Sequence, residues 1–214
     1  MYIPNSFAEK DIPTLHAFIE AHPLATVVSN AADGLVASHI PLVFHKTAGP
    51  LGTLVGHLAR ANPHARALAQ DKGDALVIFT GPDAYVSPEW YPMKQETGRV
   101  VPTWNYVAVH VQSTPRLRDD TAFLREHLES LTQAHEASRE HPWHVDDAPS
   151  DYIEQMMKAI VAVEFPIDRI EGKWKMSQNR SDADIDGVVN GLGTSPSSND
   201  GEVARIVSER RPKR

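Results

Sequence analysis

Three short runs of this sequence combine hydrogen-bonding side chains with cations or aromatic rings. The first run, Gly56–Pro63 (GHLARANP), joins the end of an expected strand to the start of an expected helix. A helix N-terminus offers unpaired backbone N–H groups and a partial positive charge, which suits a phosphate, and the guanidinium of Arg60 adds a fork of donors. The alternative interpretation is that Asn62 only caps the helix and Arg60 is an ordinary surface cation.

The second run, Val101–Tyr106, places a hydroxyl, an indole, an amide and a phenol at consecutive positions. In a strand, Thr103 and Asn105 face one way while Trp104 and Tyr106 face the other. One face could therefore hydrogen-bond the polar edge of a heteroaromatic ring while the other packs. The alternative is a core tryptophan beside an asparagine at the edge of a strand.

The third run, Lys173–Arg180 (KWKMSQNR), concentrates cations, an aromatic ring and three hydrogen-bonding side chains. A phosphorylated cofactor with a polar chain needs that mixture of side chains. The alternative is an exposed basic strand end followed by a capping turn, because runs of charge usually form solvated faces.

The eleven histidines do not fall into a recognised metal motif. His39, His57 and His110 form one candidate group and His141 with His144 another, but neither has a zinc-binding spacing such as H-E-x-x-H. We therefore expect no metal site. His57 is the one candidate for an acid or base, and the alternative for it is a structural histidine.

Composition narrows the class of protein. The chain has 214 residues, 41% of them hydrophobic, which suits one domain with a sizeable core. With no cysteine, disulfides, thiolate metal sites and cysteine nucleophiles are excluded. The start of the chain lacks a signal-peptide pattern and no apolar run approaches membrane length, so we expect a cytoplasmic protein. The net charge of −7 disfavours a dedicated nucleic-acid binder.

The hydrophobic periodicity predicts short strands interrupted by helices. We expect strands over residues 25–29, 35–44, 53–58, 75–79, 104–112 and 160–166, with 84–87 and 167–176 as further candidates. We expect helices after Asp11, over 63–70, from Asp119 or Asp120 to 138, after Ser150, over 182–192 and over 202–209. Residues 71–74 should form a turn, 88–102 a loop and 193–201 a linker. This pattern predicts an α+β barrel of about six or seven mainly antiparallel strands.

Together these runs resemble the PaiB-type family of FMN-binding negative transcriptional regulators. The matching segments are Met1–Pro4, Ala37–Leu42, Gly56–Pro63, Phe79–Tyr91, Val101–Tyr106, Val109–His110, Pro142–Trp143 and Lys173–Arg180. They occur in family order over residues 1–192, which would form the FMN-binding domain with its helical additions. Residues 193–214 depart from the family and read as a linker and a short basic tail.

The resemblance implies a split β-barrel like that of pyridoxamine phosphate oxidases and flavin reductases, with FMN bound at a homodimer interface. It implies Ser38 and His39 on a cofactor-lining strand, Arg60, Ala61 and Asn62 at the phosphate, Thr103, Trp104 and Asn105 near the ribityl chain or ring, and Lys175, Ser177 and Gln178 completing the pocket.

Three functions remain open at this point. The chain resembles an FMN-binding protein with capacity for flavin-dependent redox chemistry. A second hypothesis is a repressor that binds operator DNA, for which the basic tail Arg205–Arg214 and the third run are the supporting features. A third is haem binding on the same type of barrel, with His39 or His57 as the axial ligand.

Overall fold

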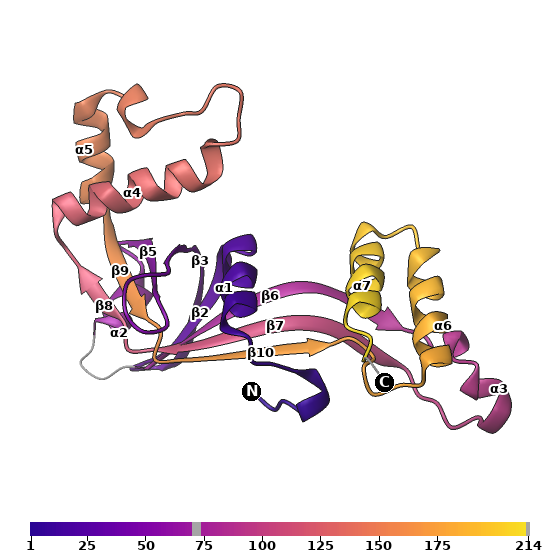
Figure 1. The fold of residues 1–214 in the computed structure, drawn as a ribbon. Helices are drawn as coiled ribbons and strands as arrows, with labels where there is room; N and C mark the ends of the chain where they lie inside the picture. The colour runs from indigo at the N-terminus through magenta and orange to yellow at the C-terminus, as the bar shows by residue number, and fades with distance from the viewer. Residues whose placement is uncertain (70–73, 213–214) are drawn as a thin grey trace. The chain divides into compact units, whose positions relative to one another are not determined.

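The computed structural model describes residues 1–69 and 74–212, which form ten strands in two antiparallel sheets with flanking helices (Figure 1). The strands are β1 (Ala8–Glu9), β2 (Leu24–Ala31), β3 (Gly34–Pro41), β4 (Val43–His45), β5 (Thr53–Ala59), β6 (Ala75–Val86), β7 (Thr103–Ser113), β8 (Arg116–Arg118), β9 (Ile160–Pro166) and β10 (Arg169–Lys175). The larger sheet has the order β1-β10-β7-β6-β2-β3, and the smaller has the order β4-β5-β9-β8. The predicted α+β class is thereby confirmed.

Seven α-helices and three short 3-10 helices join these strands in the described part of the chain. The α-helices are α1 (Ile12–Ala21), α2 (Pro63–Leu68), α3 (Met93–Thr97), α4 (Thr121–Glu136), α5 (Ser150–Lys158), α6 (Asp182–Gly193) and α7 (Ser198–Glu209). The 3-10 helices are η1 (Asn5–Phe7), η2 (Pro88–Trp90) and η3 (Val145–Asp147). None of the helices in the described residues is long and apolar enough to cross a bilayer.

Polar side chains begin several of these helices, as the sequence predicts. The side chain of Asn62 accepts a hydrogen bond from the backbone of His64 at 2.9 Å and caps α2. Asp120 accepts one from the backbone of Phe123 at 2.7 Å and caps α4. Each cap satisfies a donor that the first turn of a helix leaves unpaired.

The expected strand over residues 35–44 is wrong as a single element. It divides into β3 and β4, which belong to different sheets. Pro41 ends β3, and the backbone N–H of Leu42 donates to the carbonyl of Pro23 at 2.9 Å instead of continuing a ladder. Because proline has no N–H to contribute to a ladder, the hydrophobic run continues while the pairing partner changes.

The opposite correction applies at Gly81–Pro82, which does not break a strand. Residues 75–79 and 84–87 were expected as two strands, but β6 runs unbroken from Ala75 to Val86. The buried face shifts from odd-numbered to even-numbered residues between Phe79 and Pro82. The Gly-Pro pair therefore does not end the strand. It marks the point where the buried face of β6 changes from one side of the strand to the other, which glycine permits.

Two segments expected to lack regular structure contain helices. The 88–102 loop holds η2 and α3, and Gly98, with a φ of 66°, ends α3. The expected linker over 193–201 is also shorter, because α7 begins at Ser198. The burial of Val203 and Val207 stabilises α7, whose first turn includes residues that were expected in the linker. The expected turn over 71–74 falls largely outside the described residues, and the helix expected over 63–70 ends at Leu68.

Three short strands raise the observed number above the expected six or seven: β1 and β8 lie outside every expected strand, and β4 overlaps the end of the expected 35–44 strand. Each is two or three residues long. A hydrophobic alternation needs about four residues before it becomes visible, so these strands have no signal of their own.

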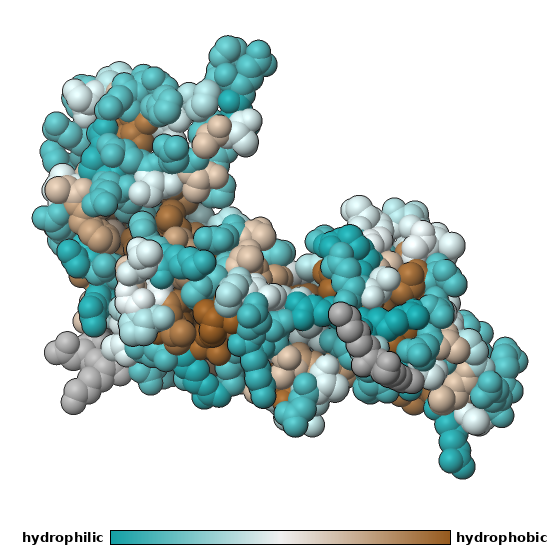
Figure 2. Space-filling view, in the orientation of Figure 1, coloured by the Kyte–Doolittle hydropathy of each residue, from teal (hydrophilic) through white to brown (hydrophobic). Residues whose placement is uncertain are grey.

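The chain divides into two compact units. The first comprises Met1–Leu15, Thr80–Val109 and Glu171–Arg214, and the second comprises His16–Phe79 and His110–Ile170. In the first unit, α6 packs against α7, and Figure 2 shows apolar atoms in the seam between these helices. In the second, α4 and α5 enclose an apolar cluster of Leu124, Val145, Ile153, Met157 and Ala162.

Candidate functional site

Four of the predicted cofactor residues meet in one small cavity of the first unit. Thr103 and Asn105 come from β7, while Lys175 ends β10 and Ser177 follows it. The cavity measures about 100 Å³, and its other lining residues are Phe7, Tyr91, Asn179 and Arg180. The neighbouring positions of β7 and β10 in the larger sheet bring these runs together.

Hydrogen bonds across these two strands fix the polar side chains. The ammonium group of Lys175 donates to the hydroxyl of Thr103 and to the carbonyl of Trp104. The amide of Asn105 donates to the hydroxyl of Ser177 at 3.0 Å, and both side chains are buried. Ser177 has a φ of 63°, a left-handed conformation that non-glycine residues adopt rarely and that recurs at functional sites.

The cavity is rich in positive charge. Burial lowers the pKa of Lys175, and the nearby charges of Lys173 and Arg180 lower it further. The guanidinium of Arg180 lies over the ring of Tyr91, 4.7 Å from its centroid. Burial raises the pKa of Tyr91, so its phenol stays neutral at physiological pH. An anion placed beside Lys175 would relieve the repulsion among the cations.

Two other predicted residues of this unit have different surroundings. Gln178 binds the backbone on both sides of its amide: its oxygen accepts from the N–H of Met176 at 2.7 Å and its nitrogen donates to the carbonyl of Trp174 at 2.6 Å. This side chain shapes the turn that follows β10. Trp104 is 54% exposed and meets the ring of Tyr85 edge-on at 6.0 Å.

In the second unit, Ser38 and Asn62 belong to a hydrogen-bonded network around His64. The hydroxyl of Ser38 lies 2.8 Å from His64 Nδ1 and accepts from the amide of Asn62 at 3.3 Å. His64 Nε2 lies 3.0 Å from the hydroxyl of Ser29. His64 is fully buried, and burial lowers its pKa. The network ties α2 to β2 and β3.

The remaining predicted residues of this unit lie at its surface. Arg60 forms an ion pair with Asp119 and donates to the carbonyl of Lys158 at 3.0 Å. Ala61 is exposed in the turn before α2. His39 is exposed on β3, with its Nδ1 3.0 Å from the hydroxyl of Thr26. The role predicted for each of these residues stays a prediction.

Three residues at these sites were not chosen from the sequence. Arg180 was visible as the last cation of the Lys173–Arg180 run, and Tyr91 closes a matched aromatic segment, but neither had been assigned a role. His64 follows the Asn-Pro cap directly. A histidine just after a helix start has no local pattern that distinguishes burial from exposure, so only the fold identifies its role.

His57, the candidate acid or base, pairs with a second histidine. Its Nδ1 lies 3.1 Å from Nε2 of His127, and burial lowers the pKa of His57. Burial, with smaller contributions from His57 and His45, lowers the pKa of His127 to about 4. Within residues 1–69 and 74–212, no group of three or more histidine and acidic side chains is arranged to hold a metal ion.

Comparison with known proteins identifies a family and related sequences for this chain. The family model described as "Putative FMN-binding domain" matches residues 1–169. An uncharacterized protein of Emericella nidulans is 36% identical, covering 98% of this chain and 97% of its own. The protease synthase and sporulation protein PAI 2 of Bacillus subtilis is 30% identical, covering 98% of both chains.

Solved structures share the fold. The FAD and heme binding protein from Mycobacterium smegmatis superposes with a TM-score of 0.60 at 22% identity, over 84% of this chain and 78% of that one. The two antiparallel sheets and flanking helices are those of a split β-barrel, as the resemblance implied.

Proposed function

Because this chain belongs to the FMN-binding domain family, we propose that it binds FMN and that the cavity lined by β7 and the end of β10 holds an anionic part of the cofactor. The observation that carries this proposal is the convergence of Lys175, Arg180 and the hydroxyls of Thr103 and Ser177 in one cavity. Cations and hydroxyl donors are the groups that recognise a phosphate.

The volume of this cavity limits the size of the group that can bind in it. A volume of about 100 Å³ suits a phosphate-sized group and is smaller than the pockets of about 300 Å³ or more that bury whole ligands. The flavin ring would therefore lie outside it. The exposed Trp104 and Tyr85 offer aromatic surface on the neighbouring strands β7 and β6.

We also propose that the protein is a homodimer. Four large apolar side chains of the first unit are exposed, namely Tyr2, Tyr85, Val101 and Trp104. Two of them, Tyr85 and Trp104, contact each other, and contiguous exposed apolar surface often marks a protein or ligand contact. Sedimentation analysis of the Trp104→Glu variant tests this: we expect a dimer for the unmodified protein and a monomer for the variant.

When bound, FMN supplies hydride or electron transfer, and the protein contributes binding, orientation and electrostatics. In this proposal Lys175 and Arg180 neutralise the anion, while Thr103 and Ser177 orient it. A direct role in DNA binding draws less support from the C-terminal segment, because Arg210 pairs with Glu9 and Arg211 pairs with Asp186.

The visible absorption spectrum before and after addition of FMN is the experiment that tests the proposal. We expect flavin bands that stay with the protein through gel filtration. Lys175→Met keeps the length of the side chain but removes its charge, and should weaken FMN binding about tenfold or more. Lys46→Met, in an exposed turn, should leave the affinity unchanged. A Soret band would favour haem, and absence of any flavin affinity would reject the proposal.

Arg60 allows a separate test of the predicted phosphate contact. Since Arg60 is paired with Asp119, a phosphate would have to replace that carboxylate. If it does, Arg60→Ala should weaken FMN binding and Asp119→Asn should maintain or strengthen it. Equal affinities for both variants and the unmodified protein would remove Arg60 from the site without affecting the role proposed for Lys175.

A further inference from the structure

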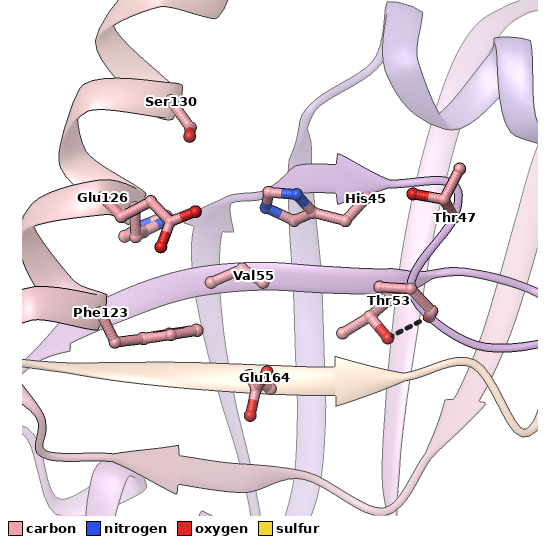
Figure 3. Close-up of a pocket in the computed structure, with 10 residues that line it drawn as sticks. His45, Thr47, Thr53, Val55, Phe123, Glu126, Ser130 and Glu164 are labelled. Atoms are coloured by element: carbon pink, nitrogen blue, oxygen red, sulfur yellow. Dashed lines mark hydrogen bonds between the residues drawn. The ribbon is translucent and has the colours of Figure 1, made fainter.

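A second cavity lies in the second unit, where α4 faces strands β4, β5 and β9 (Figure 3). Its volume is about 210 Å³, and it is lined by His45, Thr47, Ala48, Thr53, Val55, Phe123, Glu126, His127, Ser130 and Glu164. These residues are all different from those predicted to bind the cofactor. Figure 3 shows the side chains of His45 and Glu126 extending into the space between β4 and α4.

The charge of this cavity is negative. Glu126 and Glu164 are its two carboxylates, and the residues that line it include no lysine or arginine. Arg118 neutralises Glu164 through an ion pair at 2.9 Å. Glu126 has no ion-pair or hydrogen-bond partner among residues 1–69 and 74–212, so its carboxylate remains available to a cation.

The other polar atoms of the cavity can accept hydrogen bonds. Thr53 uses its hydroxyl proton on the carbonyl of Ala48 at 2.7 Å, which leaves its oxygen as an acceptor. The hydroxyl of Ser130 can also accept. Val55 on β5 and Phe123 on α4 supply apolar surface to the same lining.

His127 supplies the second observation that points to a ligand. Its side chain is 3% exposed, yet within the described part of the chain its Nδ1 has no hydrogen-bond partner. Its Nε2 is engaged with Nδ1 of His57 at 3.1 Å. If Nε2 carries the proton and donates to His57, Nδ1 is a buried acceptor without a donor. A buried polar atom of this kind costs stability unless a partner reaches it.

We propose that this cavity binds a small organic ammonium ion with an apolar body. The ammonium group would donate to the carboxylate of Glu126, and the apolar body would contact Val55 and Phe123. Because Nδ1 of His127 is closed to solvent, the imidazole ring would have to turn toward the cavity before this nitrogen could accept from the ammonium group. A primary ammonium has three donors and a positive charge, which matches a site that offers acceptors and a carboxylate. The proposal is independent of FMN, because none of the residues that line this cavity is among the residues predicted to bind the cofactor.

Benzylamine, with benzyl alcohol as a neutral probe of nearly the same shape, tests this proposal on the full chain. Histidine side-chain NMR signals would report binding at His127. We expect benzylamine to shift them saturably with an affinity of about 1 mM, and benzyl alcohol to bind at least about tenfold more weakly.

Two variants of α4 locate the ligand. Glu126→Gln removes the carboxylate from the cavity and should weaken benzylamine binding about tenfold. Glu129→Gln makes the same change of charge on the same helix, where Glu129 pairs with Arg125 at 2.6 Å, and should leave binding unchanged. No saturable shift, equal binding of the two probes, or equal affinities for the two variants would overturn the proposal. FMN affinity should be the same in both variants.

Discussion

At the scale of single residues, the polar pair Asn105–Ser177 anchors the turn that follows β10. The two side chains lie 3.0 Å apart and are 1% and 4% exposed. Ser177 holds a left-handed backbone conformation, which costs about 1–3 kcal/mol unless its surroundings compensate. The hydrogen bond from Asn105 is one such compensation, and it keeps Ser177 beside Lys175.

Removing Asn105 should therefore destabilise the protein. We expect Asn105→Ala to lower the free energy of unfolding by about 1–3 kcal/mol, because the hydroxyl of Ser177 would remain buried without this partner. Ser177→Gly relieves the backbone conformation but leaves the buried amide of Asn105 without this partner, so the two effects should largely cancel. Urea unfolding of both variants and the double variant measures the coupling; strictly additive effects would mean that the hydrogen bond contributes no stability.

At the scale of elements, two glycines of α6 explain how that helix packs. A Cβ atom at Gly187 would lie 1.8 Å from the carbonyl oxygen of Trp90, and one at Gly191 would lie 2.3 Å from the Trp90 ring. Gly187 and Gly191, one helical turn apart, thus let η2 approach α6 closely. This contact holds Trp90, the last residue of η2, and the next residue, Tyr91, lines the candidate site.

A methyl group at Gly191 should disrupt this contact. We expect Gly191→Ala to lower the free energy of unfolding by about 1–3 kcal/mol through overpacking, since the tryptophan ring must move. Gly193→Ala is the matched control, because a Cβ there meets nothing within 4 Å and alanine favours a helix. Equal melting temperatures for the two variants would contradict the packing role.

The His57–His127 pair links α4 to β5 and makes stability depend on pH. Other titratable groups near His127 are His45 on β4, Glu126 on α4 and Glu164 on β9. The pKa of His127 is about 4 in the folded protein, against 6.5 for an ordinary histidine. Below pH 6.5 the unfolded chain therefore binds a proton that the folded protein refuses, and stability falls between pH 6.5 and pH 4.

Urea unfolding at pH 7.5 and pH 5 measures this effect. We expect His127 to account for a loss of about 2 kcal/mol at pH 5, which His127→Gln should remove. His135→Gln, at an exposed position near the end of the same helix, should retain the full loss. An unchanged pH dependence in His127→Gln would show that other groups cause it.

At the scale of the whole molecule, the C-terminal helix is part of the folded core of its unit. Val203 and Val207 of α7 are fully buried, as are Ile185, Val188 and Leu192 of α6. Arg210 lies over the ring of Trp174 at 5.0 Å and pairs with Glu9. The boundary predicted at residue 193 stays a prediction, but α7 is integrated into the first unit.

Deleting residues 198–214 should therefore destabilise the protein instead of only reducing its charge. The deletion would expose the apolar face of α6, so we expect a lower melting temperature and aggregation. Val207→Ala should cost about 1–2 kcal/mol, while Arg205→Ala, at an exposed position, should cost little. A truncated protein that melts normally but loses retention on promoter DNA would instead support the nucleic-acid hypothesis.

Local features of the fold and site were predictable from the sequence because their causes lie within a few residues. The caps at Asn62 and Asp120 need only a side chain and the next turn of backbone. The long strands and helices have visible periodicity, and the ordered motifs identified the family. The resemblance predicted Thr103 and Asn105 near the ribityl chain or ring and Lys175 and Ser177 as parts of the same pocket, and these four residues do line one cavity.

Only the tertiary structure decided which of these residues meet. The hydrogen bond between Asn105 and Ser177 spans 72 positions, and the His57–His127 contact spans 70. Such contacts depend on strand order and helix packing, which no local pattern encodes. The same reason explains why α7 packs within the first unit and why Arg60 pairs with Asp119. The sequence by itself determined which residue types could bind a cofactor, and long-range strand pairing and helix packing determined which of those residues lie together.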